Sequence, residues 1–483
     1  MKTFKTILIG CIIAFANTTA IYANNLQIGI PTVATATTLT FTIQWDNSWR
    51  VSSGTNNYDA VWIFAKYQNC SGTNDWNHVT LAAGSSVSGG VLQVVNTSDG
   101  LYKGIFVQRS ADGIGNISSS TVTLQMSFAD ASYNYQVFAM EMVYVPVGSF
   151  YVGDNTSNNR CYLSPAGTPF NVTSDGALAL GANFYANSTN YAIALAYPLG
   201  YDAFYSMKYE ISQEQYAKFL STLTYAQQTA RMDIPPTSAP GTYALGTGVN
   251  RNGICIKTSG VFNTVPAIMG NDLTPGTIDN TNDGQNIACN WLSWEDLLAY
   301  LDWSALRPMT EFEFEKICRG PNTAVANEYP WATTTITQAP SSALTNPQLS
   351  TEVSTATGDG LTNYGNGTAG NYGPGPNRVG QAARAATTQQ GAGAAWYGAL
   401  DMAGNVWEHC ILVNATITNA AGDGAISAAG AQNQGWPTYT SATRRGSAYS
   451  QSFTYCKTSD RTFYNTPTNT RNSDGGGRGV RMP

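Results

Sequence analysis

The sequence has few charged residues and almost no histidine. Only 11% of its 483 residues are charged, about half the usual fraction, and the net charge is −6. Lysine and arginine are scattered rather than clustered, so nucleic-acid binding is not expected. His78 and His409 are the only two histidines. This excludes a metal site built from several histidines and argues against Ser-His-Asp catalysis.

Long apolar segments are missing after the N-terminus. Residues 1–23 begin with positive charge, continue with an apolar run and end in small residues, which is typical of a secretory signal peptide. No later stretch approaches the roughly 20 apolar residues of a membrane span. We therefore expect an exported protein without a membrane span, found outside the cell or at its surface, with the periplasm as the alternative.

Closely spaced cysteines are missing as well. One of the eight cysteines, Cys11, lies in the predicted signal peptide, and the others have long, irregular spacings with no C-x-x-C pair. A zinc site is therefore not expected. In an oxidising compartment these cysteines are expected to form disulfides, with an odd thiol left unpaired or linked to another chain.

The first part of the mature chain has the pattern of β-strands. Apolar and polar residues alternate from Leu39 to Trp45, and Gly, Asn and Ser separate several such short runs. Ala60–Phe64 is apolar throughout and predicts a strand covered on both faces. Residues 24–138 are therefore predicted to form an all-β sandwich domain.

The second part, residues 139–483, mixes helix signals with long irregular segments. Capping-box sequences predict helices that begin at Ser212, Ser293 and Thr310. Two segments rich in Gly, Ala, Thr and Asn, residues 222–286 and 332–395, are expected to be long surface loops.

Three blocks in this second part resemble the formylglycine-generating enzyme, or sulfatase-modifying-factor, family. Residues 307–315 read R-P-M-T-E-F-E-F-E, residues 401–408 read D-M-A-G-N-V-W-E, and a terminal stretch runs from Arg445-Gly-Ser447 to Gly479-Val-Arg481. The family pattern is R-L-P-T-E-A-E-W-E, then D-M-x-G-N-V-W-E-W, then G-G-S and G-F-R. The resemblance implies an α+β fold similar to a C-type lectin, following the all-β sandwich.

The same resemblance implies that the family's chemistry is incomplete here. In the enzymes, a serine is followed by two cysteines that hold copper and oxidise a substrate cysteine of a sulfatase to formylglycine. Ser447 matches the serine, but Ser450 and Tyr455 stand at the two cysteine positions, and a hydroxyl is a poor ligand for Cu(I). Bound copper is therefore not expected. The alternative is a shifted active site that uses Ser447 and Cys456.

A disulfide is also implied by the resemblance. Cys318 begins the Cys-Arg-Gly triplet that carries one partner of a family disulfide, and Cys456 is placed to supply the other. A Cys318–Cys456 bond would leave no thiol for copper chemistry.

The block at residues 401–408 resembles the calcium-binding loop of the family. Two side-chain carboxylates and two backbone carbonyls on one tight loop suit a hard cation, which would have a structural role. The ligands implied are Asp401, Gly404, Val406 and Glu408. In the alternative interpretation, the two carboxylates accept backbone amides without a metal.

Between residues 448 and 476 the terminal stretch is dominated by Tyr, Phe, Ser, Thr, Asn and Gly. Such a composition is typical of antibody paratopes, and it resembles the variable regions of retroelement-diversified lectin-fold proteins. We therefore predict a non-enzymatic binding protein whose ligand is a protein or a glycan at a cell surface. The predicted ligand-binding residues are Tyr449, Ser450, Gln451, Phe453, Tyr455, Phe463, Tyr464 and Asn465. The alternatives are a formylglycine-generating oxidase, a structural envelope protein, or an ordinary polar loop at this place.

Overall fold

The computed structural model describes most of the chain. The described residues are 25–69, 75–154, 168–176, 178–179, 192–193, 197–246, 250–365, 374–384, 387–413, 415–417, 421–464 and 469–483. The predicted signal peptide, Cys70, Cys161 and Asn465 lie outside them. The fold is mixed α+β with mostly strands and few helices, as predicted.

In the described part of residues 25–145, all regular elements are strands. They are β1 (Gln27–Ile28), β2 (Thr32–Thr35), β3 (Thr38–Arg50), β4 (Asp59–Gln68), β5 (Trp76–His78), β6 (Ser86–Val87), β7 (Leu92–Asn96), β8 (Ile105–Arg109), β9 (Gly113–Gln125) and β10 (Asn134–Val145). They form antiparallel sheets, which the alternating sequence pattern predicted.

Residues 146–483 combine short strands with four α-helices in the described part of the chain. The helices are α1 (Gln213–Ser221), α2 (Tyr225–Arg231), α3 (Trp294–Trp303) and α4 (Glu311–Arg319). The strands are β11 (Phe150–Val152), β12 (Phe170–Val172), β13 (Leu178–Ala179), β14 (Ala192–Ile193), β15 (Phe204–Met207), β16 (Ile254–Thr258), β17 (Ile268–Asn271), β18 (Arg307–Pro308), β19 (Thr337–Gln338), β20 (Leu344–Thr345), β21 (Val353–Ser354), β22 (Leu361–Thr362), β23 (Trp407–Ile411), β24 (Ala442–Arg445), β25 (Gly475–Gly476) and β26 (Gly479–Arg481).

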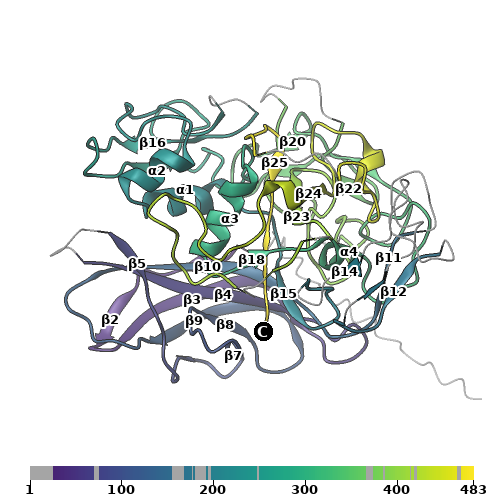
Figure 1. The fold of residues 1–483 in the computed structure, drawn as a ribbon, viewed down its shortest axis with the longest axis horizontal. Helices are drawn as coiled ribbons and strands as arrows, with labels where there is room; N and C mark the ends of the chain where they lie inside the picture. The colour runs from purple at the N-terminus through teal and green to yellow at the C-terminus, as the bar shows by residue number, and fades with distance from the viewer. Residues whose placement is uncertain are drawn as a thin grey trace, which may run out of the picture.

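Two sheets pack face to face at one side of the molecule (Figure 1). The first, five-stranded sheet has the order β1-β3-β9-β6, with β2 also paired to β3. The second, eight-stranded sheet has the order β18-β26-β15-β10-β4-β8-β7, with β5 paired to β4. The core between them consists of apolar side chains that alternate along the strands, for example Leu39, Phe41 and Ile43.

The second sheet is covered on both faces. Val61 and Ile63 of β4 point into the core between the sheets, whereas Trp62 and Phe64 pack against the helices on the opposite face. Figure 1 shows α1 and α3 on that opposite face. This explains why Ala60–Phe64 is apolar throughout, as the sequence predicted.

Strand β10 connects the N-terminal strands with the later part of the chain. It pairs with β4 along most of its length and, through Met142–Val145, with β15. The boundary predicted between residues 138 and 139 therefore lies inside β10. Strand β26, near the C-terminal end, enters the same sheet between β15 and β18. The second sheet is thus built from both predicted domains.

The helices begin where the capping boxes predicted. The Ser212, Ser293 and Thr310 hydroxyls each accept a hydrogen bond from the backbone amide of the third helical residue. The side chain of that third residue in turn accepts from the backbone amide of the capping residue. A fourth box, Thr224 with Gln227, opens α2 inside a segment that was expected to be loop. That expectation was wrong for α2, β16 and β17, because these elements are too short to show a clear period.

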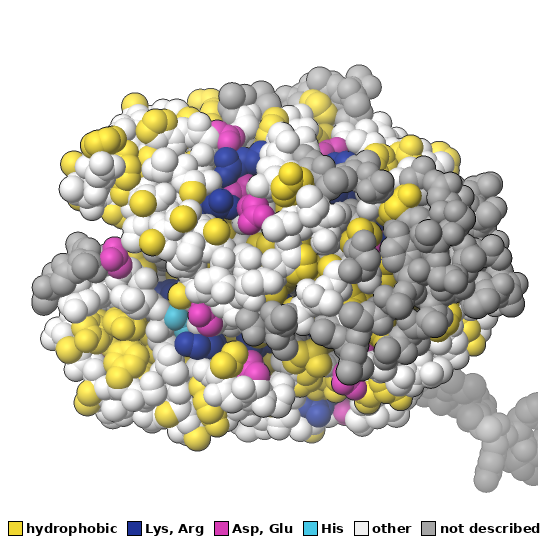
Figure 2. All heavy atoms as spheres, viewed as in Figure 1, with side chains coloured by type: hydrophobic (Ala, Val, Ile, Leu, Met, Phe, Trp, Pro, Cys, Tyr) yellow, Lys and Arg dark blue, Asp and Glu magenta, His cyan; other side chains and the backbone are white. Residues whose placement is uncertain are grey.

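The face shown in Figure 2 is mostly uncharged, in line with the composition. Its charged side chains gather in a few small groups between uncharged ones. In the described part of the chain, no helix has the length and apolar character needed to cross a membrane.

Candidate functional site

Helix α4 anchors the terminal stretch through buried ion pairs. The Arg461 guanidinium donates to both carboxylate oxygens of Glu311, at 2.7 and 2.8 Å. Arg445 donates to Glu311 at 3.2 Å and to Glu315 at 2.7 Å. All four side chains are fully buried. We call Glu311, Glu315, Arg445 and Arg461 the ionic clamp, because they hold residues 445–461 against α4.

One further arginine, Arg319, extends this network. Arg319 pairs with Glu328 and with Glu315, and donates to the Ser459 hydroxyl at 2.7 Å. Each acid of the network meets a guanidinium, which offsets the cost of removing these charges from water only while the partners remain in place.

The clamp places Ser447 beside Cys456. Ser447 has a left-handed backbone with φ of 74°, in the turn that follows β24. The thiol of Cys456 is fully buried and hydrogen-bonded with the Ser447 side chain. Burial raises the pKa of Cys456 to about 12, although the contacts with Ser447 and the Gly404 backbone lower it. The thiol is therefore protonated at neutral pH, whereas a thiolate is the metal ligand and the nucleophile.

The residues at the two family cysteine positions make other contacts. Ser450 donates to the Asp474 carboxylate at 2.6 Å, and Gln451 donates to the same oxygen at 3.1 Å. Tyr455 is half-buried, and its ring centroid is 5.1 Å from that of Phe463. Neither position offers sulfur.

The predicted Cys318–Cys456 disulfide is not formed. All five described cysteines are free and buried. Cys318 lies in an apolar cluster with Phe314 and Cys410, whereas Cys456 packs in a different cluster with Tyr329 and Trp331. The prediction was wrong because the two cysteines are buried in different apolar clusters.

An aromatic surface lies over this segment. The Phe463 ring is 4.9 Å from the Trp407 ring, and the Arg444 guanidinium lies 5.3 Å from the centroid of Phe463. Phe453 is 47% exposed, and its ring is 6.0 Å from that of Tyr364. We call the following residues the aromatic surface: Tyr364, Arg444, Ser450, Gln451, Phe453, Tyr455 and Phe463. Trp407 is only 1% exposed and supports this surface from below through its contact with Phe463.

The structure brings together most of the predicted ligand-binding residues, but two point inward. Tyr449 is only 2% exposed and hydrogen-bonds to the Ser473 carbonyl. Tyr464 packs on the helical core beneath Arg461. Both support the fold around the surface. Tyr364, Trp407 and Arg444 were missed, because they come from elements outside the stretch whose composition gave the signal.

The predicted calcium ligands meet an arginine. The Glu408 carboxylate accepts from Arg478 Nε at 2.6 Å, and Asp401 accepts the Gly380 amide at 2.5 Å. Burial raises the pKa of both acids, and Arg478 lowers it. Arg478 also donates to three backbone carbonyls, including Leu400 at 2.8 Å.

As placed, these residues do not fit a calcium ion. No group of three or more His, Cys, Asp or Glu side chains in the described part of the chain is arranged to hold a metal. The positive charge of Arg478 already lies against Glu408. Calcium therefore stays a prediction from the motif.

A known family model matches most of the chain. Residues 127–482 match the family model described as Sulfatase-modifying factor enzyme 1-like domain, FGE-sulfatase. The match begins just before β10 and ends after β26. No curated protein matches the chain.

Proposed function

We propose that this chain, which belongs to the FGE-sulfatase family, is a non-catalytic binding protein that uses its aromatic surface to recognise a glycan or protein ligand at a cell surface. The observation that carries the proposal is the state of Cys456. Its thiol is buried, and no other described cysteine belongs to its cluster. Burial also raises the pKa of this thiol to about 12. The family's chemistry needs two sulfur ligands for copper.

The composition and support of the aromatic surface favour binding. Aromatic rings give a large contact area at a small cost in conformational entropy, and the hydroxyl and amide groups of Ser450 and Gln451 supply directional contacts. Phe453 projects into solvent. Beneath it, the ionic clamp holds the backbone of the segment, so the rings are positioned before a ligand arrives.

Binding to arrays of bacterial surface glycans and of displayed peptides tests the proposal. The wild type is compared with Phe453→Ala and Tyr455→Ala, and Tyr439→Ala serves as the control because Tyr439 is 37% exposed outside the surface. We expect both test variants to lose about tenfold or more in affinity for the array ligand, as for an aromatic hot spot. Equal losses in all three variants, or none, would contradict the proposal.

The oxidase alternative has one observation in its favour, the contact between Ser447 and Cys456. Copper content after reconstitution with Cu(I), and oxygen uptake with a cysteine-containing sulfatase peptide, separate the two functions. The binding proposal expects neither. One copper per chain together with oxygen uptake that is lost in Cys456→Ala would replace it by the oxidase.

A further inference from the structure

A cavity is lined by residues that do not belong to the aromatic surface. It has a volume of about 650 Å³ and lies between β10 and the helices α1 and α3. Residues of both predicted domains line it, from Asn25 near the first strand to Val379. Its size falls within the usual range for small-molecule sites, and such sites occur preferentially where two parts of a protein meet.

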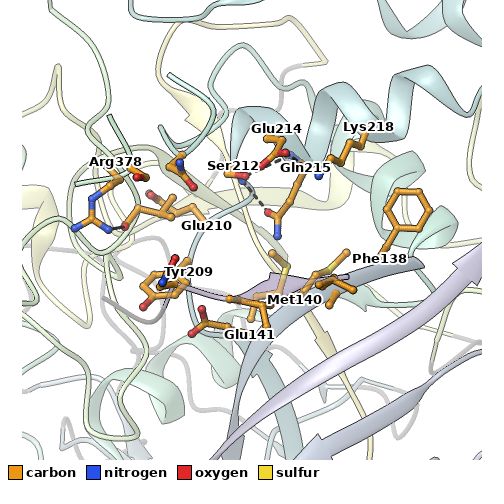
Figure 3. Close-up of a pocket in the computed structure, with 18 of the residues that line it drawn as sticks. Phe138, Met140, Glu141, Tyr209, Glu210, Ser212, Glu214, Gln215, Lys218 and Arg378 are labelled. Carbon is orange, nitrogen blue, oxygen red and sulfur yellow. Dashed lines mark hydrogen bonds and ion pairs between the residues drawn. The ribbon is translucent and has the colours of Figure 1, made fainter. Parts of the chain in front are cut away.

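The cavity has an apolar part and a polar part (Figure 3). Phe138 and Met140 lie toward one side, and Tyr300 and Trp303 of α3 belong to the same apolar lining. Glu141, Tyr209 and Glu210 lie toward the other side. A ligand that fills the cavity therefore needs an apolar body and one polar end.

The charges of the lining favour a cationic end. Four carboxylates line the cavity, those of Asp46, Glu141, Glu210 and Glu214, against two cations, Lys218 and Arg378.

Both cations are already engaged. Lys218 pairs with Glu214 at 2.7 Å. Arg378 donates to backbone carbonyls, at 2.6 Å to that of Glu352 and at 3.1 Å to that of Val379.

Burial, together with the neighbouring Asp401 and Glu408, raises the pKa of Glu210 well above its ordinary value, so this group is not counted as a charge. The other three carboxylates still outnumber the two cations, and the lining has an excess of negative charge.

The excess is concentrated around Glu141 and Tyr209. Glu141 is 3.8 Å from Lys208, a lysine that also compensates the charge of Asp59. One buried cation thus serves two carboxylates. The Tyr209 hydroxyl is buried and has no hydrogen-bond partner among the described residues. Such a group has lost its water without gaining a replacement, unless a ligand supplies it.

We propose that this cavity binds a cationic amphiphile, with a primary ammonium group between Glu141 and the Tyr209 hydroxyl. The ammonium donates to the Glu141 carboxylate and to the oxygen of Tyr209. An aromatic body packs against Phe138, Met140, Tyr300 and Trp303. The site is separate from the aromatic surface and does not depend on the function proposed for it.

The test is calorimetric titration of the full chain with tryptamine, and with indole-3-propionate as a probe of similar size and opposite charge. We expect saturable binding of tryptamine and none of the propionate. Glu141→Gln keeps the shape of the side chain and is expected to weaken tryptamine binding at least about tenfold, because it removes a buried charge partner. Tyr209→Phe removes one hydroxyl and is expected to weaken binding several-fold.

Matched controls keep the result interpretable. Asp279→Asn removes a carboxylate from an exposed ion pair with Lys257, outside the cavity lining, and is expected to bind tryptamine like the wild type. Tyr439→Ala, outside both the cavity lining and the aromatic surface, is expected to do the same. Equal binding of both probes, binding of neither, or unchanged affinity in a folded Glu141→Gln and Tyr209→Phe would overturn the proposal.

Discussion

The core between the two sheets and the ionic clamp are buried in opposite ways. The first consists of apolar side chains such as Leu39, Val122 and Leu124, and any well-packed apolar group contributes to it. The clamp buries Glu311, Glu315, Arg445 and Arg461, each of which requires its particular partner. Apolar burial stabilises a shape, whereas paired burial of charge specifies which residues meet. The segment that carries the aromatic surface is held in the second way.

Breaking the clamp should produce the largest effect. Glu311→Ala leaves Arg445 and Arg461 without a shared carboxylate in a dry site, and we expect a loss of about 3–5 kcal/mol in the free energy of unfolding. Chemical denaturation measures it. The double variant with Arg461→Met should lose less than the sum of the two single variants, because the second change removes an uncompensated charge. Strict additivity would contradict the paired description.

Arg478 offers the next test, because it occupies the place where a structural cation was predicted. Arg478→Met leaves Glu408 and Asp401 without the guanidinium, and we expect a loss of about 3 kcal/mol by the same argument. Thermal melts with EDTA and with calcium compare the two proteins. The wild type should be insensitive to both, and the variant should regain stability with calcium. A fall in the wild-type melting temperature in EDTA would instead establish calcium in the native loop.

A pH-sensitive contact lies between strands β4 and β5 and helix α3. Lys66 lies 2.9 Å from His78 Nδ1 and donates to the Trp303 carbonyl at 2.7 Å. Burial lowers the pKa of His78 well below its ordinary value, and Lys66 lowers it further.

Because the folded pKa of His78 is depressed, the unfolded chain binds the proton more readily. The contribution of His78 to stability is complete above the unfolded pKa of about 6.5 and is lost as pH falls below it, by roughly 2 kcal/mol at pH 5. Denaturation from pH 7.5 to 5 should show a shallower slope in His78→Gln than in the wild type. Burial raises the pKa of Asp302 to about 7, so this group titrates in the same pH range. Because Asp302 is present in both proteins, its titration contributes to both curves. Parallel curves would exclude His78 as the titrating group.

The smallest effect is expected in the core between the sheets. Ile43→Val removes one buried methylene group and should cost about 1 kcal/mol. The loss should be independent of pH and of salt, unlike that of the clamp variants. Denaturation at low and high ionic strength provides the comparison. A salt-dependent loss of stability in Ile43→Val would contradict the difference proposed between the two cores.

Local sequence patterns predicted where helices and strands form. They did not predict which of these elements pair or pack with one another. The box at Thr310 and the alternation from Leu39 predicted α4 and β3, because capping and strand burial depend on near neighbours. The pairing of β10 with β15, and the approach of Arg478 to Glu408, depend on segments far apart in the chain. No local pattern records them.

The candidate site, too, was predicted only where local sequence patterns indicate it. The composition of the terminal stretch indicated Phe453 and Tyr455, and the missing cysteines indicated that family chemistry is incomplete. Arg444 joins the surface, and the buried Trp407 supports it, only through the pairing of β23 with β24 and the packing of Phe463 on both. The burial of Cys456 away from Cys318 likewise depends on tertiary packing.

The position of β26 has a consequence for how the molecule is made. Because this strand lies between β15 and β18, the second sheet stays open until residues 479–481 have left the ribosome. Until then β15 is paired with β10 on one side only, and its other edge is unpaired. An unpaired strand edge can pair with another chain, so β26 also protects this sheet against association with other molecules.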